Sequence, residues 1–164
     1  MAYGGGYWRA RSDGLQTTVD GAGIAFDLAV GHAIIENLIL FGEFMVSVHP
    51  ETRHYSTMDD KTMVAALVGF GAGVAYYIMP ANVYFSGTLA VLTQPDDRKS
   101  IPTPPDLGTG FGGKLAAGKD WWVSTNWSLG VAAELVLADL EGRDSPAPSW
   151  MLTTFSMLFV ATFN

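Results

Sequence analysis

Residues 22–34 read Ala-Gly-Ile-Ala-Phe-Asp-Leu-Ala-Val-Gly-His-Ala-Ile, and this stretch decides the fold. Its even positions include Ile24, Phe26, Leu28 and Ile34, whereas its odd positions are Gly, Ala and one Asp. A period of two predicts a β-strand whose side chains alternate between two environments. We therefore expect a strand with one large apolar face and one face of small side chains.

The small face of this strand indicates which side points outward. In a soluble sheet the large apolar side chains point inward, and Lys, Glu, Thr and Ser meet water on the other face. Here the second face holds Gly and Ala instead, which suits a crowded interior. The apolar face is then free to contact lipid. This pattern is typical of the strands of transmembrane β-barrels.

Composition supports a membrane protein with a single domain over residues 1–164. Hydrophobic residues make up 49% of the chain and charged residues only 15%, against about 25% in soluble domains. The chain has no Cys, which excludes disulfides and thiolate metal sites. A net charge of -7 without a basic run argues against nucleic acid as a partner. We expect no cofactor and no metal site.

The same alternation recurs along the chain and predicts an all-β fold, an eight-stranded antiparallel up-and-down barrel that spans a membrane. A helix over Met63–Ala81 is the alternative, but Gly69, Gly71 and Gly73 would each cost it about 1 kcal/mol. The expected strands are Tyr3–Ser12, Ala22–Ile34, Leu38–His49, Leu67–Ile78, Val83–Thr93, Thr109–Lys119, Trp127–Ala138 and Trp150–Asn164.

Long and short connections alternate between these strands, which is typical of barrels in the bacterial outer membrane. We expect both termini and the short turns in the periplasm, long loops outside the cell, and an export signal already removed before Met1. The long loops are acidic and would present a surface for interaction; the acidic residues expected there are Asp13, Asp20, Glu51, Asp59, Asp60, Asp96, Asp97, Asp106, Asp139, Glu141 and Asp144.

The end of the chain carries a resemblance to a known family. The last expected strand alternates and finishes Ala161-Thr162-Phe163-Asn164. With the eight strands, it resembles the small outer-membrane barrels of the type of the OmpA transmembrane domain, OmpX and OmpW. The resemblance implies that the barrel-assembly machinery reads the last strand, with Phe159 and Phe163 as its signal. Asn164 is a departure, because the family usually ends on the aromatic residue.

Charged side chains on the small faces predict a network inside the barrel. An eight-stranded barrel is just wide enough to be filled by side chains, and unpaired charges there are costly. We expect a network that stabilises a filled lumen, similar to the cluster in OmpA-like barrels; its residues are Arg9, Arg11, Asp27, Glu43, Lys114 and Glu134. Aromatic residues are expected to form an interfacial girdle at the periplasmic rim, from Trp8, Tyr76, Trp121, Trp122, Trp127 and Phe163.

These features predict a structural, adhesion or surface-interaction role without catalysis. The expected partners are the bilayer, lipopolysaccharide, the assembly machinery, and a second copy or a surface partner bound through the loops. Two alternatives stay open. One is a narrow channel for small solutes, gated by the charges. The other is a lipid-modifying enzyme, an acyl hydrolase or transferase, using Ser47, His49 or His54 near the outer rim.

Overall fold

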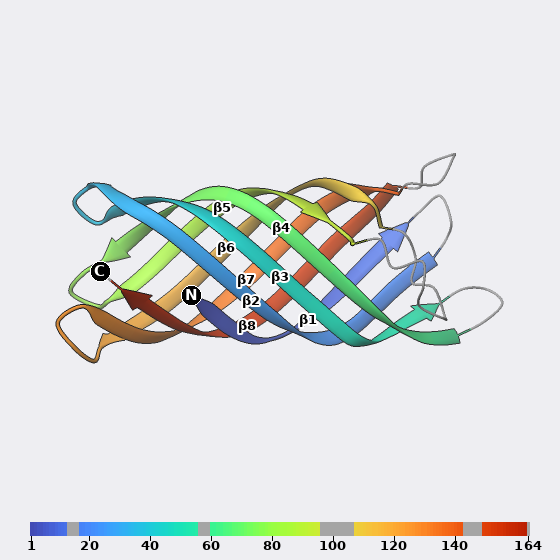
Figure 1. Cartoon of the computed structure of the whole chain (residues 1–164), viewed down its shortest axis with the longest axis horizontal. Coiled ribbons are helices and arrows are strands. Elements are labelled where there is room, and N and C mark those ends of the chain that lie inside the picture. Colours follow the sequence, from blue (N-terminus) through green and yellow to red (C-terminus); the bar gives the residue numbers. More distant parts are fainter. Residues whose placement is uncertain (13–16, 56–59, 96–106, 143–148, 164) are drawn as a thin grey trace.

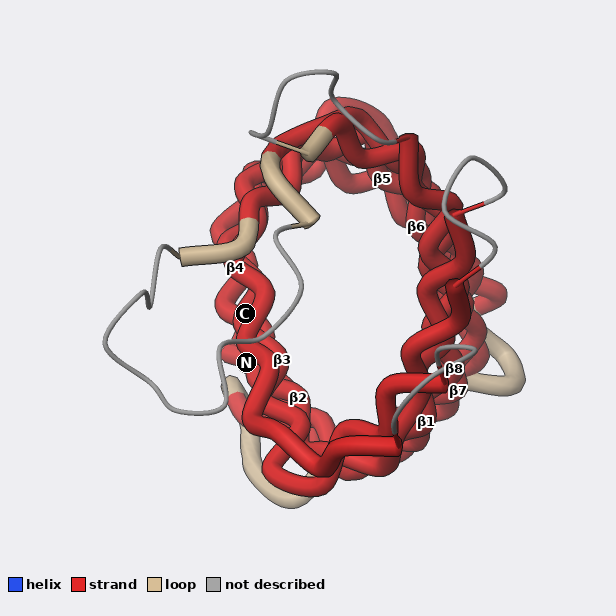
Figure 2. The backbone as a smooth tube through the Cα atoms, turned by 90° about the vertical axis from the view of Figure 1, so that its right-hand side faces the viewer, coloured by secondary structure: helices blue, strands red, loops and turns tan. Residues whose placement is uncertain are grey.

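The computed structural model describes residues 1–12, 17–55, 60–95, 107–142 and 149–163. Eight strands form one closed barrel in which each strand pairs antiparallel with its neighbours and β1 pairs with β8 (Figures 1 and 2). The predicted all-β, eight-stranded antiparallel barrel is confirmed. The strands are β1 Ala2–Ser12, β2 Thr17–Ile35, β3 Leu38–Tyr55, β4 Asp60–Ile78, β5 Val83–Thr93, β6 Thr109–Trp122, β7 Trp127–Glu141 and β8 Ser149–Phe163.

The two ends of the barrel differ in their connections. Residues 36–37, 79–82 and 123–126 link strands at the end where both termini lie, which we call the turn end (Figure 1). The opposite end, where the undescribed segments join the strands, is the loop end. Asn37 and Asn82 take the left-handed backbone conformation, which Asn tolerates better than most residues. The predicted turn at Met79–Asn82 is present, with Ala81 N–H donating to the Ile78 carbonyl at 3.0 Å.

Most strands are longer than the sequence predicts. β2, β3, β4 and β7 extend at the loop end into stretches expected to be loops. Their ladders continue there, because Thr18 pairs with Tyr55 and Tyr55 pairs with Asp60. Backbone pairing needs no apolar side chain once a strand has passed the apolar belt. Asp20, Glu51, Asp60, Asp139 and Glu141 therefore lie on strands, whereas Asp13, Asp59, Asp96, Asp97, Asp106 and Asp144 lie outside the described residues.

Residues 63–78 form part of β4, where the sequence left a spanning helix as the alternative. No helix long and apolar enough to cross a membrane occurs within the described residues. On β4 the glycines at 69, 71 and 73 face the lumen side of the barrel wall, and Phe70, Val74 and Tyr76 are exposed outside. Side chains built at Gly71 or Gly73 would collide with Thr88 of the adjacent strand.

Large apolar side chains cover the outside of the barrel as predicted for β2 to β8. They include Phe26 and Val30 on β2, Phe70 on β4, and Phe155 and Phe159 on β8, all exposed. Their inward neighbours, such as Ala25, Met45 and Leu158, are buried. The alternation in the sequence thus maps onto the two faces of the wall.

The facing of β1 is the reverse of the prediction. Trp8 and Ala10 are completely buried in the lumen, whereas Arg9 and Arg11 point outside. The prediction assumed that arginines on a spanning strand must avoid lipid. Arg9 instead lies near the loop end, where its guanidinium contacts the Asp20 carboxylate of β2 at 3.4 Å. The larger Trp8 side chain fills the lumen at this level.

Candidate functional site

The loop-end half of the lumen is filled by apolar side chains. We call this packing the loop-side core. It includes two tryptophans and three leucines that are at least 98% buried: Trp8, Leu107, Leu140, Trp150 and Leu152. His49 also belongs to this region and packs against Trp8, with the two rings tilted by 35° and their centroids 4.9 Å apart. This part of the lumen is filled as predicted.

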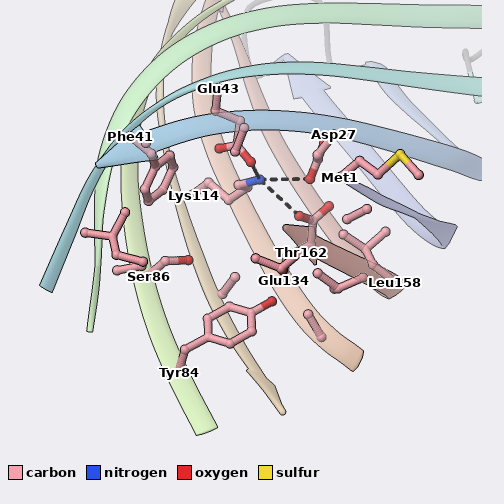
Figure 3. A pocket seen from close by; sticks show the side chains of 18 of the residues that line it. Met1, Asp27, Phe41, Glu43, Tyr84, Ser86, Lys114, Glu134, Leu158 and Thr162 are labelled. Carbon is pink, nitrogen blue, oxygen red and sulfur yellow. Dashed lines mark hydrogen bonds and ion pairs between the residues drawn. The ribbon is translucent and has the colours of Figure 1, made fainter. Parts of the chain in front are cut away.

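Near the middle of the barrel lies a charged cluster. Lys114 of β6 places its ammonium 2.9 Å from Asp27 of β2, 2.5 Å from Glu43 of β3 and 3.3 Å from Glu134 of β7 (Figure 3). All four residues are more than 90% buried. We call these four residues the Lys114 cluster. The neighbouring strands β2 and β3 are thereby tied across the lumen to the neighbouring strands β6 and β7.

The packing around the cluster depends on small residues and one hydroxyl. Thr88 of β5 donates a hydrogen bond to Glu43 at 3.1 Å. Gly71 leaves the space that the Thr88 methyl occupies, since a Cβ at Gly71 would lie 2.6 Å from it. The small face seen in the sequence therefore serves a specific purpose here. It leaves room for long charged side chains to reach the barrel axis.

Three carboxylates in this cluster share one lysine. Lys114 donates hydrogen bonds to Asp27 and to Glu43, but the Oε2 atom of Glu134 accepts none. Its contact with Lys114 is an ion pair without hydrogen-bond geometry. Arg9 and Arg11, which were expected to supply further positive charge, lie on the outside of the barrel. Their place in the predicted lumen network is thus wrong, and the cluster holds more negative than positive charge.

On the turn side of the cluster the lumen is open. A cavity of about 200 Å³ is lined by side chains from every strand, with the Lys114 cluster as its floor. Its walls carry the aromatic rings of Phe41, Tyr77 and Tyr84, of which Figure 3 shows Phe41 and Tyr84 beside the floor. Ala29 and Gly31, which line this cavity, are exposed to solvent. We call this space the turn-end cavity.

The presence of this cavity corrects the prediction of a lumen filled along its whole length. Several lining positions are small, among them Ala29, Ala75, Ala116 and Ala132. Such side chains are too short to meet across the barrel. A second, smaller cavity of about 30 Å³ lies on the loop side of the cluster and is also bounded by Asp27, Lys114 and Glu134. The cluster therefore separates two empty spaces.

A fourth inward carboxylate, Asp120, lies near the turn end and was missed from the sequence. It accepts hydrogen bonds from Tyr77 at 3.5 Å and from Ser128 at 3.4 Å, and it is buried. The missed signal was its even position on β6, the same parity as Lys114. The prediction ended this strand at Lys119, so Asp120 was assigned to neither face.

Five of the six residues predicted for the aromatic girdle are exposed at the turn end: Tyr76, Trp121, Trp122, Trp127 and Phe163. Trp127 and Phe163 pack edge to face across β7 and β8, with centroids 5.3 Å apart. Trp8 is the exception, because it is buried in the loop-side core. Phe159 and Phe163, the expected assembly signal, both point outward on β8.

Comparison with known proteins finds the fold but no family. No protein-family model matches the sequence, and no curated protein matches it. Among solved structures, the outer membrane protein OprG from Pseudomonas aeruginosa is similar over 99% of this chain and 93% of its own, with a TM-score of 0.56 and 11% identity. A Pseudomonas aeruginosa FadL homologue aligns with a TM-score of 0.39 and 12% identity, over 90% of this chain and 37% of its own. The likeness to OprG agrees with the closed eight-stranded barrel described above.

Proposed function

We propose that the protein is an integral barrel of the bacterial outer membrane, with the turn end in the periplasm and the loop end at the cell surface. The observation that carries this proposal is the outer belt of large apolar side chains. On the outward face of β8, no polar residue interrupts the belt from Phe155 to Phe163, eight residue steps. At about 3.4 Å per step and a tilt of about 40°, these steps span about 21 Å, close to the apolar band of about 25 Å in such barrels.

The direct test of this proposal is folding into a bilayer. The protein, refolded into phospholipid vesicles, should float with the lipid and migrate differently on SDS gels before and after boiling. A closed barrel resists SDS until it is heated, because its backbone hydrogen bonds are all satisfied within the ring. Protein that pellets away from the vesicles, or that shows one mobility in both samples, would contradict the proposal.

We further propose a role at the surface in place of catalysis or open-pore transport. The loop-side core supports this, because among the described residues its side chains leave no wide water-filled passage on that side of the cluster. The proposed partners are lipopolysaccharide around the belt, the assembly machinery at β8, and a surface partner or second copy at the loop end. His49, one of the residues considered for lipid hydrolysis, packs against Trp8, and we assign it a packing role.

A narrow passage for small solutes is the second candidate, and one observation favours it. Cavities lie on both sides of the Lys114 cluster, so rearranging its side chains would join two existing spaces. Single-channel recording in planar bilayers tests this. If the cluster gates a passage, Lys114→Met should change the frequency or size of openings. Lys119→Met, at the turn-end rim, is the control, and identical traces for wild type and both variants would exclude the gate.

A further inference from the structure

The turn-end cavity has the chemistry of a binding site for a cation. Its floor carries three carboxylates and one ammonium. The ammonium is oriented by its hydrogen bonds to Asp27 and Glu43. Glu134 is left with the longest of the three ion pairs and with a buried Oε2 that accepts no hydrogen bond. A group that donates hydrogen bonds and carries positive charge would complement this floor.

The walls of the cavity suit an organic cation better than a bare ion. Phe41, Tyr77 and Tyr84 contribute aromatic rings, whose faces attract positive charge. The Tyr84 hydroxyl points into the cavity in Figure 3, and this hydroxyl makes no hydrogen bond within the described residues. Leu158 and Val160 add apolar surface on the opposite side. The cavity thus combines an acidic floor with aromatic and aliphatic walls.

The size and the opening of the cavity set the size of the ligand. An apolar cavity of about 150 Å³ holds benzene, and the turn-end cavity measures about 200 Å³. It therefore has room for one ring with a short aminoalkyl group. Because the mouth lies at the turn end and the loop-side core closes the other half, such a ligand enters and leaves from the turn end.

We propose that the turn-end cavity binds a small organic ammonium ion, with its charged group at Glu134 and its apolar part against Phe41 and Tyr84. The site goes beyond the membrane placement and surface role proposed above. It does not require the Lys114 cluster to open. Binding takes place on the turn side of an intact cluster, so a barrel that never conducts would still hold the ligand.

Benzylamine is the probe for this site, compared with benzyl alcohol and benzoate, which have similar size but no positive charge. Calorimetric titration of the folded protein in maltoside detergent should show one saturable benzylamine site. Benzyl alcohol should bind at least tenfold more weakly, and benzoate should not bind. Equal binding of benzylamine and benzyl alcohol would overturn the proposal, as would the absence of saturable benzylamine binding.

Variants locate the site. Glu134→Gln keeps the shape of the floor and should weaken benzylamine binding at least tenfold. Glu141→Gln removes the same charge from the outside of the barrel at the loop end and should leave binding unchanged. Ala132→Leu fills the cavity without touching the charges and should abolish binding.

Each variant is first checked for the heat-dependent gel shift of a closed barrel. If Glu134→Gln does not fold, Ala132→Leu and the comparison of the three ligands still test whether the turn-end cavity binds an ammonium ion. Equal losses in Glu134→Gln and Glu141→Gln would overturn the assignment.

Discussion

Lys114 is the only cation in the cluster, so three buried carboxylates depend on it. Lys114→Met should lower the free energy of unfolding by about 3–5 kcal/mol, because it leaves those carboxylates without a counter-charge. Urea unfolding in lipid vesicles, followed by tryptophan fluorescence, measures the change. Lys119→Met is the matched control, since the Lys119 ammonium contacts a backbone carbonyl at the exposed turn-end rim. Equal losses for the two variants would show that the cluster adds no stability of its own.

Neighbouring residues on β1 should respond very differently to truncation. Trp8→Ala removes a fully buried ring that packs on His49, and we expect a loss of about 3–5 kcal/mol. Arg9→Ala removes a side chain that is 59% exposed and pairs with Asp20 at the surface, so the loss should be much smaller than for Trp8→Ala. The same unfolding assay compares them. A larger loss for Arg9→Ala than for Trp8→Ala would support the facing that the sequence predicted, with Arg9 inside the barrel.

The contrast between β1 and the other strands shows how far residue patterns reach. Asp27, Glu43, Lys114 and Glu134 could be placed in the lumen from parity alone, because each is the rare charge on a face of small residues. The rule failed at Arg9, since β1 has no strong apolar face and arginine is tolerated outside the belt beside an acid. Arg9 can face outward because of its position along β1 near the loop end. The alternation of residues does not encode that position.

At the scale of elements, barrel closure depends on how closely β1 approaches β8. Gly4 faces inward at this seam, and a Cβ there would collide with the Met157 carbonyl. Gly5 faces outward, and its Cβ would meet only the Gly23 carbonyl at 3.6 Å. Gly4→Val should therefore cost about 1–3 kcal/mol and reduce the SDS-resistant fraction of refolded protein. Gly5→Val should match wild type, and similar gel patterns for both variants would contradict this account of the seam.

Strand existence was predictable for all eight elements, whereas strand length was not. Apolar alternation marks only the part of each strand within the belt. Beyond it, β2, β3 and β4 continue as paired backbone with polar side chains, and composition there resembles a loop. The turn-end cavity was missed for a related reason. A small inward residue leaves a cavity only where no larger side chain reaches it from across the barrel. The sequence does not show which inward residues face one another across the lumen.

For the whole molecule, the outer belt should tolerate charge at its edge but not at its middle. Phe159 and Met151 lie outward on the same strand, 73% and 65% exposed. Phe159→Arg should cost about 2–4 kcal/mol of stability in a bilayer, whereas Met151→Arg at the loop end should cost at most about 1 kcal/mol. Unfolding from vesicles measures both. Equal effects would mean that the belt does not coincide with the hydrocarbon layer.

The two ends of the chain meet at the turn end, where the Ala161 N–H donates to the Met1 carbonyl at 2.8 Å and the Met1 amine donates to the Ala161 carbonyl at 2.7 Å. β1 and β8 therefore pair in the same way as strands that follow each other in the chain. A circular permutant, joined from Asn164 to Met1 by a short flexible linker and cut at residues 79–82, keeps every strand beside its original neighbours. It also moves Phe163 away from the chain terminus. Comparing its folding with that of the original chain would separate what the barrel needs in order to close from what the proposed assembly machinery would need in order to recognise it.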